Sequence, residues 1–150
     1  RTTLIVRDVD VSLRFYRDVM GLDVWYDQDM PVGGQVLPAG EPGAKVRVAI
    51  LKGNDPLVGM LGVMAFLDPP IEVPPLPKRP LAIRDAIFVA GAKDVHDIHK
   101  RMQTAPAYIY CPPVDDTVPG ADGSTIKMST MSFFDPDGYF FELNTRHVLK

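Results

Sequence analysis

The stretch from Leu4 to Leu22 reads Leu-Ile-Val-Arg-Asp-Val-Asp-Val-Ser-Leu-Arg-Phe-Tyr-Arg-Asp-Val-Met-Gly-Leu, and its hydrophobic pattern changes along its length. The apolar residues at its start have the length of a short strand. Apolar side chains then recur at helical spacing, with Asp10 suited to the N-cap and Gly21 to the residue after the helix. Aromatic and β-branched residues from Leu22 to Tyr26 predict a strand. The stretch therefore predicts a strand, a helix and a second strand.

Two further strands are predicted before the middle of the chain. Between Lys45 and Leu51, lysine, arginine and alanine alternate with valine and isoleucine, which is typical of a half-buried strand. The mostly apolar run from Val58 to Phe66 predicts a fourth strand. The first half of the chain thus has the predicted order strand, helix, strand, strand, strand.

The second half of the chain repeats this order. Its predicted elements are a strand over Ala86–Val89, a helix from about Asp94, and strands over Ala107–Tyr110, Ile126–Phe134 and Tyr139–Leu143. A shift of 84 residues lays Val11 on Val95, and a shift of 83 lays Leu51 on Phe134. An unrelated α+β protein can also show this order twice, but the nearly constant shift favours a repeated module.

Proline is unusually frequent, with 15 residues in a chain of 150, and it clusters between residues 68 and 80. Proline lacks the backbone donor that a helix interior or a central strand needs, so this segment predicts an extended linker. The predicted organisation is a first module over residues 1–70, a linker over 71–80 and a second module over 81–150.

The composition is that of an ordinary globular domain, with 46% hydrophobic and 23% charged residues. A net charge of −3 offers no basic surplus for nucleic acid, and no apolar run reaches the ~20 residues that cross a membrane. The one cysteine, Cys111, cannot form an internal disulfide. We therefore expect a cytoplasmic protein without nucleic-acid or membrane partners.

Two motifs carry a resemblance to a known family. The stretch Leu4 to Leu22 and the sequence Phe-Asp-Pro-Asp-Gly-Tyr-Phe-Phe-Glu-Leu, residues 134–143, resemble the opening and closing signatures of the vicinal oxygen chelate superfamily. That group includes glyoxalase I, bleomycin-resistance proteins and extradiol dioxygenases. The resemblance implies an α+β glyoxalase-like fold, in which two βαβββ modules form a concave mixed sheet around the site.

The resemblance also implies a divalent metal ion, held by His and Glu side chains on the first and last strands of each module. Carried over by position, the first ligand falls on Arg1, whose guanidinium stays protonated and cannot coordinate a cation. No His, Asp or Glu occurs from Pro56 to Leu67, where the next ligand belongs. The second module offers Asp85, under the 84-residue shift, and Glu142 within the closing motif. Both are weak metal candidates, so no cofactor is predicted, with a bound divalent metal as the alternative.

Glu142 is the predicted catalytic residue, as a general base or as an anchor for a polar substrate atom. We expect Arg1 or another cation to pair with it at the floor of the hollow. An ordinary strand residue is the alternative role for Glu142. For Asp85, a surface pair with the adjacent Arg84 is favoured over metal binding.

The three histidines do not supply the missing ligands. His96 and His99 lie three residues apart in the second predicted helix, on the flank of its apolar face, and are expected to be solvated. His147 follows the closing motif and is expected in the tail.

Aromatic and methionine side chains gather on the predicted strands and suit an apolar pocket, although alternation turns roughly half of them toward the core. The predicted ligand-binding residues are Arg1, Trp25, Tyr110 and Met128. The loops Gln28–Gly43 and Pro112–Ser124 are long enough to be lids, and surface loops are the equal alternative.

The favoured function is therefore the binding of a small, largely apolar or aromatic organic molecule in the sheet hollow, without a complete family metal site. A divergent metal-dependent lyase, isomerase or extradiol dioxygenase is the alternative, and a purely structural module is a third. A homodimer is expected, because a sheet with a helix on one face leaves its other face to be covered. The sequence does not identify the ligand.

Overall fold

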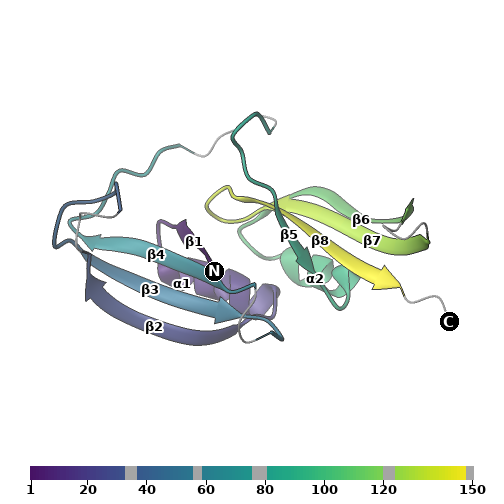
Figure 1. Cartoon of the computed structure of the whole chain (residues 1–150), viewed down its shortest axis with the longest axis horizontal. Helices are drawn as coiled ribbons and strands as arrows, with labels where there is room; N and C mark the ends of the chain where they lie inside the picture. Colours follow the sequence, from purple (N-terminus) through teal and green to yellow (C-terminus); the bar gives the residue numbers. More distant parts are fainter. Residues whose placement is uncertain (33–36, 56–58, 76–80, 120–123, 148–150) are drawn as a thin grey trace. The chain divides into compact units, whose positions relative to one another are not determined.

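The computed structural model describes residues 1–32, 37–55, 59–75, 81–119 and 124–147, and it divides the chain into two compact units. The units are Arg1–Pro75 and Leu76–Lys150 (Figure 1). In each unit the described residues form one four-stranded sheet in the order β, α, β, β, β. The α+β fold of two βαβββ modules is thereby confirmed. The division falls inside the predicted linker, of which residues 76–80 lie outside the described residues.

The first sheet has the strand order β1-β4-β3-β2, with β1 parallel to β4 and the other neighbours antiparallel. Its elements are β1 (Thr2–Ile5), α1 (Val9–Leu13), the π-helix η1 (Arg14–Val19), β2 (Asp23–Pro31), β3 (Lys45–Lys52) and β4 (Leu61–Asp68). The parallel pair brings the two ends of the module together, because β1 begins it and β4 ends it.

Helix α1 is capped by Asp8. The sequence pattern had predicted Asp10 as the cap, and this prediction is wrong. The Asp8 carboxylate accepts hydrogen bonds from the backbone N–H groups of Asp10 at 2.7 Å and Val11 at 3.1 Å. This position satisfies donors that the first helical turn leaves unpaired. Gly21 follows the helical segment with a φ of +81°, the left-handed conformation expected there.

The second sheet repeats this topology with the order β5-β8-β7-β6. Its elements are β5 (Phe88–Gly91), α2 (Val95–Met102), β6 (Tyr108–Pro119), β7 (Thr125–Phe134) and β8 (Phe140–His147). Asp94 caps α2, since its carboxylate accepts from His96 N at 2.9 Å, and the helix begins close to the predicted start at about Asp94.

The two modules correspond by a shift of 86 residues at their first strands and helices, two more than predicted. Strands β1 and β5 begin at Thr2 and Phe88, and helices α1 and α2 begin at Val9 and Val95. Apolar residues in a helix recur every three or four positions, so hydrophobic pattern alone tolerates a slip of this size.

Two predicted loops are partly strand. Strand β2 continues to Pro31, and β6 runs to Pro119 by pairing with β7, so the predicted loop at Pro112–Ser124, whether lid or surface loop, is largely an edge strand. Edge strands tolerate proline, and the register shifts between Cys111 and Val114, where Pro112 and Pro113 lie. Residues 33–36 and 120–123 of these predicted loops lie outside the described residues.

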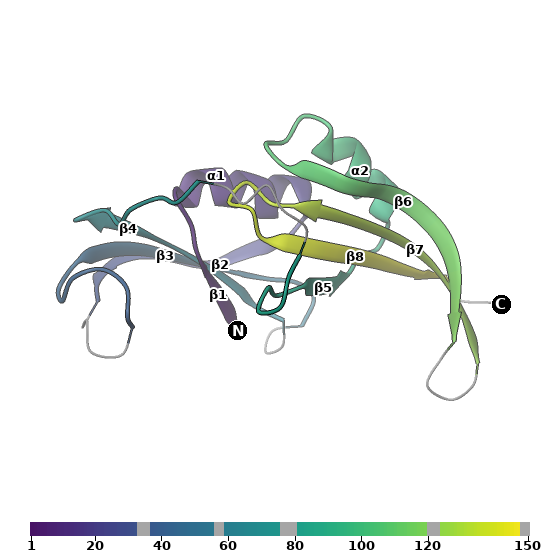
Figure 2. The same ribbon diagram turned by 90° about the horizontal axis from the view of Figure 1, so that it is seen from above.

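Each helix packs on one face of its own sheet (Figure 2). In the second unit the buried side chains of this core come from α2, β7 and β8: Val95, Ile98, Met102, Met131, Phe133, Phe141 and Leu143. Because neighbouring strand residues alternate between faces, the positions between them lie on the opposite face, away from the helix. No helix in the described part of the chain has both the length and the apolar character that crossing a membrane requires.

Candidate functional site

The first sheet has its face away from α1 covered by the chain itself. The buried residues there are Ala44, Val46, Val48, Ile50, Met64 and Phe66, and Val32, Leu37, Ala39 and Ile71 are among the residues packed against them. At Gly40, with a φ of +68°, a Cβ atom would lie 2.2 Å from Phe66 Cε1. Residues 37–44, which precede β3, therefore pack on the Phe66 ring and cover this face.

In the described part of the second unit, the corresponding sheet face is open. Val89 on β5 is 62% exposed, and Tyr108 and Tyr110 on β6 are each 66% exposed. The Tyr108 ring lies 6.2 Å from Phe134, Phe134 lies 5.1 Å from Phe140, and Phe140 lies 6.1 Å from Tyr110, between ring centroids. We call these four side chains the aromatic row. It gives the second module an exposed aromatic surface suited to an organic ligand.

Glu142 lies on the same open face, two residues along β8 from Phe140. Register places it between Val89 of β5 and Ser132 of β7. Its Oε1 accepts a hydrogen bond from Asn144 Nδ2 at 3.0 Å, and Asn144 Oδ1 accepts from Thr130 Oγ1 at 2.6 Å. The half-buried carboxylate is thus oriented by neutral partners. Its predicted pairing with Arg1 would join the two units and stays a prediction.

The predicted ligand-binding residues fall in both units. Arg1 and Trp25 belong to the first, where Trp25 is 57% exposed at the register shift of β2. Tyr110 belongs to the aromatic row. Met128 is six residues from Phe134, on the order of 20 Å along β7, and lines a separate cavity of about 520 Å³. The structure therefore brings Tyr110 and Glu142 to one face and sets Met128 apart from the aromatic row.

Asp85 does not occupy the first-strand position that the sequence assigned to it. It precedes β5 and closes a turn, where its carboxylate accepts from Ala82 N at 2.6 Å and its own N–H donates to Ala82 O at 3.0 Å. With the shift of 86 residues, the counterpart of Arg1 is Ile87, which is an exposed apolar residue. The prediction that Asp85 is the counterpart of Arg1 is therefore wrong, because it used a shift of 84 residues where the structure has 86.

The donor set does not fit a metal ion held as the family resemblance implies. The first-strand ligand positions hold Arg1 and Ile87, and the equivalent last-strand positions hold Gly62 and Glu142. Of these four residues Glu142 alone offers a carboxylate or imidazole, and Arg1 brings a fixed cation beside Gly62. Across the described ranges, no three His, Cys, Asp or Glu side chains form a group that could hold a metal ion.

His147 was predicted to lie in the tail, and this prediction is wrong. It is the last residue of β8 and joins a polar cluster on the helix side of the sheet. The buried Ser129 hydroxyl donates to Asp115 Oδ1 at 2.5 Å and lies 2.6 Å from His147 Nε2. Because the hydroxyl donates to Asp115, it accepts from His147. The Ser129 hydrogen bond lowers the pKa of Asp115, and the nearby His96 and His147 act in the same direction. His96 itself is exposed, as expected.

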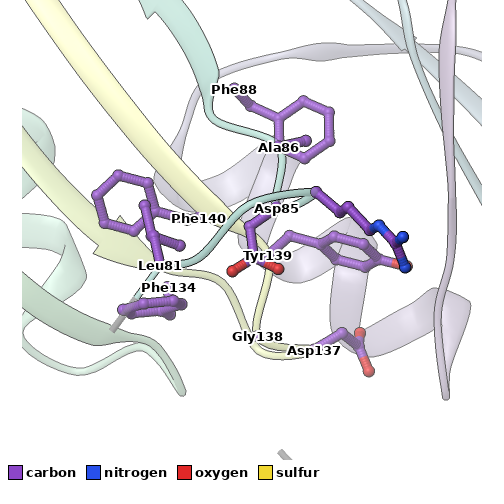
Figure 3. Close-up of a pocket in the computed structure, with 10 residues that line it drawn as sticks. Leu81, Asp85, Ala86, Phe88, Phe134, Asp137, Gly138, Tyr139 and Phe140 are labelled. Carbon is purple, nitrogen blue, oxygen red and sulfur yellow. The ribbon is translucent and has the colours of Figure 1, made fainter. Parts of the chain in front are cut away.

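A cavity of about 420 Å³ adjoins the two middle side chains of the aromatic row, Phe134 and Phe140 (Figure 3). It is lined by Leu81, Arg84, Asp85, Ala86, Phe88, Phe134, Asp137, Gly138, Tyr139 and Phe140. In Figure 3, Leu81 lies beside Phe134 and Phe140, so the segment before β5 forms one wall of the cavity. Arg84 and Asn144 were not predicted as site residues from the sequence. The two-residue alternation Phe140, Glu142, Asn144 was the available signal for Asn144, whereas Arg84 had none.

Comparison with known proteins agrees with this fold. A family model described as Glyoxalase/Bleomycin resistance protein/Dioxygenase superfamily matches residues 1–143. A glyoxalase family protein from Bacillus cereus superposes with a TM-score of 0.75 and 15% identity, over 99% of this chain and 93% of that chain. Trypanothione-dependent glyoxalase I from Leishmania major gives a TM-score of 0.55 and 19% identity, over 95% and 82%.

Glyoxalase I from Zea mays gives a TM-score of 0.57 and 17% identity, and the match covers 95% of this chain but 44% of that one. No curated protein sequence matches the chain. At these identities the solved structures support the fold, whereas the family model covers nearly all of the sequence. The chain therefore belongs to the glyoxalase/bleomycin resistance protein/dioxygenase superfamily.

Proposed function

We propose that this protein binds a small, largely apolar or aromatic organic molecule on the open face of its second module. The observation that supports this most directly is the difference between two equivalent sheet faces. The first is covered by its own segment around Gly40, whereas the second exposes Tyr108 and Tyr110 and leaves Phe134 and Phe140 half-buried. Exposed aromatic side chains beside a cavity form the kind of surface that binds flat apolar ligands.

A fluorescence titration with N-phenylnaphthylamine, a neutral apolar probe, tests the proposal. We expect saturable binding to the wild type and about threefold to tenfold weaker binding to Phe140→Leu and Tyr110→Leu, which keep apolar volume but lose ring contacts. Leu67→Ala is the matched control, because it removes an exposed apolar side chain from the first module. Absence of saturable binding, or equal loss in all three variants, would contradict the proposal.

Glu142 supplies the polar contact of this site. A carboxylate accepts hydrogen bonds but donates none, so Glu142 selects a ligand that carries a donor. We expect Glu142→Gln to weaken the binding of naphthol about threefold to tenfold while leaving methoxynaphthalene unchanged. Unchanged naphthol binding in this variant would remove Glu142 from the site.

The proposal includes binding without the family's metal, because a divalent ion would find one suitable carboxylate at the equivalent strand positions. We expect purified protein to carry clearly less than one equivalent of Zn, Ni, Mn or Fe by elemental analysis after dialysis. One tightly bound ion per chain would instead favour the metal-dependent lyase, isomerase or dioxygenase alternative.

A further inference from the structure

The Glu142 carboxylate is held in a defined orientation on the open face of the second sheet. Its Oε1 atom accepts from Asn144 Nδ2 at 3.0 Å, and Asn144 Oδ1 in turn accepts from Thr130 Oγ1 at 2.6 Å. Because Thr130 engages the amide oxygen, the amide NH₂ group is the end that faces the carboxylate. Asn144 therefore acts as a positioning residue for Glu142.

The negative charge of Glu142 has no cationic partner within the described part of the second unit. Its Oε1 accepts from a neutral amide, and its Oε2 accepts from no described group of this unit. Arg146 lies four residues further along β8, which is about 13 Å of strand. A half-buried carboxylate without a counter-ion gains more from a charged donor than from a neutral one.

The aromatic row begins beside this carboxylate. Phe140 precedes Glu142 by two residues on the same face of β8, on the order of 7 Å along the strand. The rings of Phe134 and Tyr110 lie 5.1 and 6.1 Å from that of Phe140, between centroids. The faces of aromatic rings carry partial negative charge and attract cations. The rings and the carboxylate therefore favour the same sign of charge in a ligand.

The cavity that adjoins Phe134 and Phe140 has an excess of the same charge. It lies toward the turn that precedes β8, and its wall holds two carboxylates, Asp85 and Asp137, and one guanidinium, Arg84. An anion on the two rings would meet carboxylates in both directions along the face, and like charges repel. The distribution of charge around the rings therefore disfavours an anionic ligand.

From this arrangement we infer that the ligand of the second module is an arylalkylamine, bound as its ammonium cation. Its ring packs on Phe134 and Phe140, and its ammonium group donates to Glu142. A linker of about two carbons between ring and nitrogen suits the two-residue spacing of Phe140 and Glu142. The ligand itself thereby supplies the cation that the sequence predicts beside Glu142. The inference rests on the proposed function and specifies its ligand class.

Calorimetric titration with three matched naphthalenes tests the inference: cationic naphthylethylammonium, neutral naphthylethanol and anionic naphthylacetate. We expect the ammonium compound to bind the wild type about threefold to tenfold more tightly than the alcohol, since hydrogen bonds between charged groups are stronger. Naphthylacetate should bind most weakly. Higher salt should weaken binding of the ammonium compound and spare the alcohol, because salt screens the attraction between charges.

Glu142→Gln removes the charge and keeps an oxygen that can accept from Asn144. This variant should bind the ammonium compound and the alcohol about equally. Glu72→Gln makes the same change at an exposed carboxylate of the first unit and should keep the preference for the ammonium compound. The salt dependence of the wild type tests the same charge without any substitution.

The outcomes separate the two proposals. Equal binding of the ammonium compound and the alcohol to the wild type, tightest binding of naphthylacetate, or an unchanged preference in Glu142→Gln would overturn the cationic ligand and leave the proposed function standing. The first of these results is expected if Arg1 of the first unit occupies Glu142. Failure of all three compounds to bind would overturn both.

Discussion

Glu142 and Gly62 occupy equivalent positions in the two sheets, opposite Val89 and Thr3 on the first strands. Nothing larger than glycine fits at residue 62 without movement, because a Cβ atom there would lie 2.8 Å from Thr3 Oγ1. The Arg1 side chain lies over the same position, with its Cδ atom 3.4 Å from that Cβ. At the scale of the residue, the second module therefore retains a polar group where the first has none.

Gly40 is the residue on which the covering of the first sheet depends. We expect Gly40→Ala to lower the free energy of unfolding by about 2 to 4 kcal/mol, because its Cβ atom meets the Phe66 ring and its φ disfavours alanine. Gly43→Ala is the control, since Gly43 also has a positive φ but has open space around its Cβ position. It should lose about 1 kcal/mol. Equal losses in urea denaturation would show that the contact with Phe66 contributes nothing.

At the scale of the element, Arg47 connects β3 to both β2 and α1. Its guanidinium donates to the two Asp27 oxygens at 2.8 and 2.7 Å and to Asp10 Oδ1 at 2.9 Å. The hydrogen bonds from Arg47 lower the pKa of Asp27 below its ordinary value of 3.8. The Arg47 guanidinium thus joins β3, β2 and α1. Because its contact with Asp27 is bidentate and it also reaches the helix, it holds α1 on the sheet more firmly than an isolated surface ion pair would.

We expect Arg47→Gln to lower the free energy of unfolding by about 1 kcal/mol at neutral pH. Because the pKa of Asp27 is lower in the folded protein than its ordinary value of 3.8, the ion pair contributes its full stability above pH 3.8. This contribution is lost as the pH falls through the pKa of Asp27 in the folded protein. The difference between wild type and variant should therefore shrink in urea denaturation at about pH 3.

Lys45→Gln provides the comparison, because Lys45 pairs with Asp29 at 2.8 Å while both side chains stay largely exposed. It should change stability by less than about 0.5 kcal/mol at either pH. A difference for Arg47→Gln that persists undiminished in acid would exclude Asp27 as its source.

At the scale of the whole molecule, two modules of the same topology treat the same sheet face differently. In the first, residues between β2 and β3 pack on β3 and β4. In the second, the equivalent chain continues as the long edge strand β6, which pairs with β7 and leaves the face bare. The first module thereby covers its own sheet face, and the second module leaves that face available for binding.

We expect this protein to be a homodimer in solution, because Ile87, Val89, Tyr108 and Tyr110 are each more than half exposed and a second copy would cover this apolar surface. Light scattering at micromolar concentration should give twice the chain mass of 16.6 kDa. A mass equal to one chain would reject the dimer while leaving the ligand proposals intact.

The sequence by itself determined the order of the elements, the two-module fold and the place of Glu142 on the last strand. It also determined that Pro56 to Leu67 carries no metal-ligating side chain of the expected kinds. These features depend on residue identity and on periodicities between near neighbours in the chain, which the sequence shows directly.

Only the tertiary structure decided the two-residue correction that separates Asp85 from Arg1, the place of His147 in β8, and the contrast between the covered and the open sheet face. Each depends on residues far apart in the chain, such as Gly40 against Phe66 or Ser129 against His147. The alternation of a strand marks its two faces but does not say what covers them. Arg84 and Tyr139 line one cavity for the same reason, since a turn before β5 and a turn after β7 meet only once the sheet has formed.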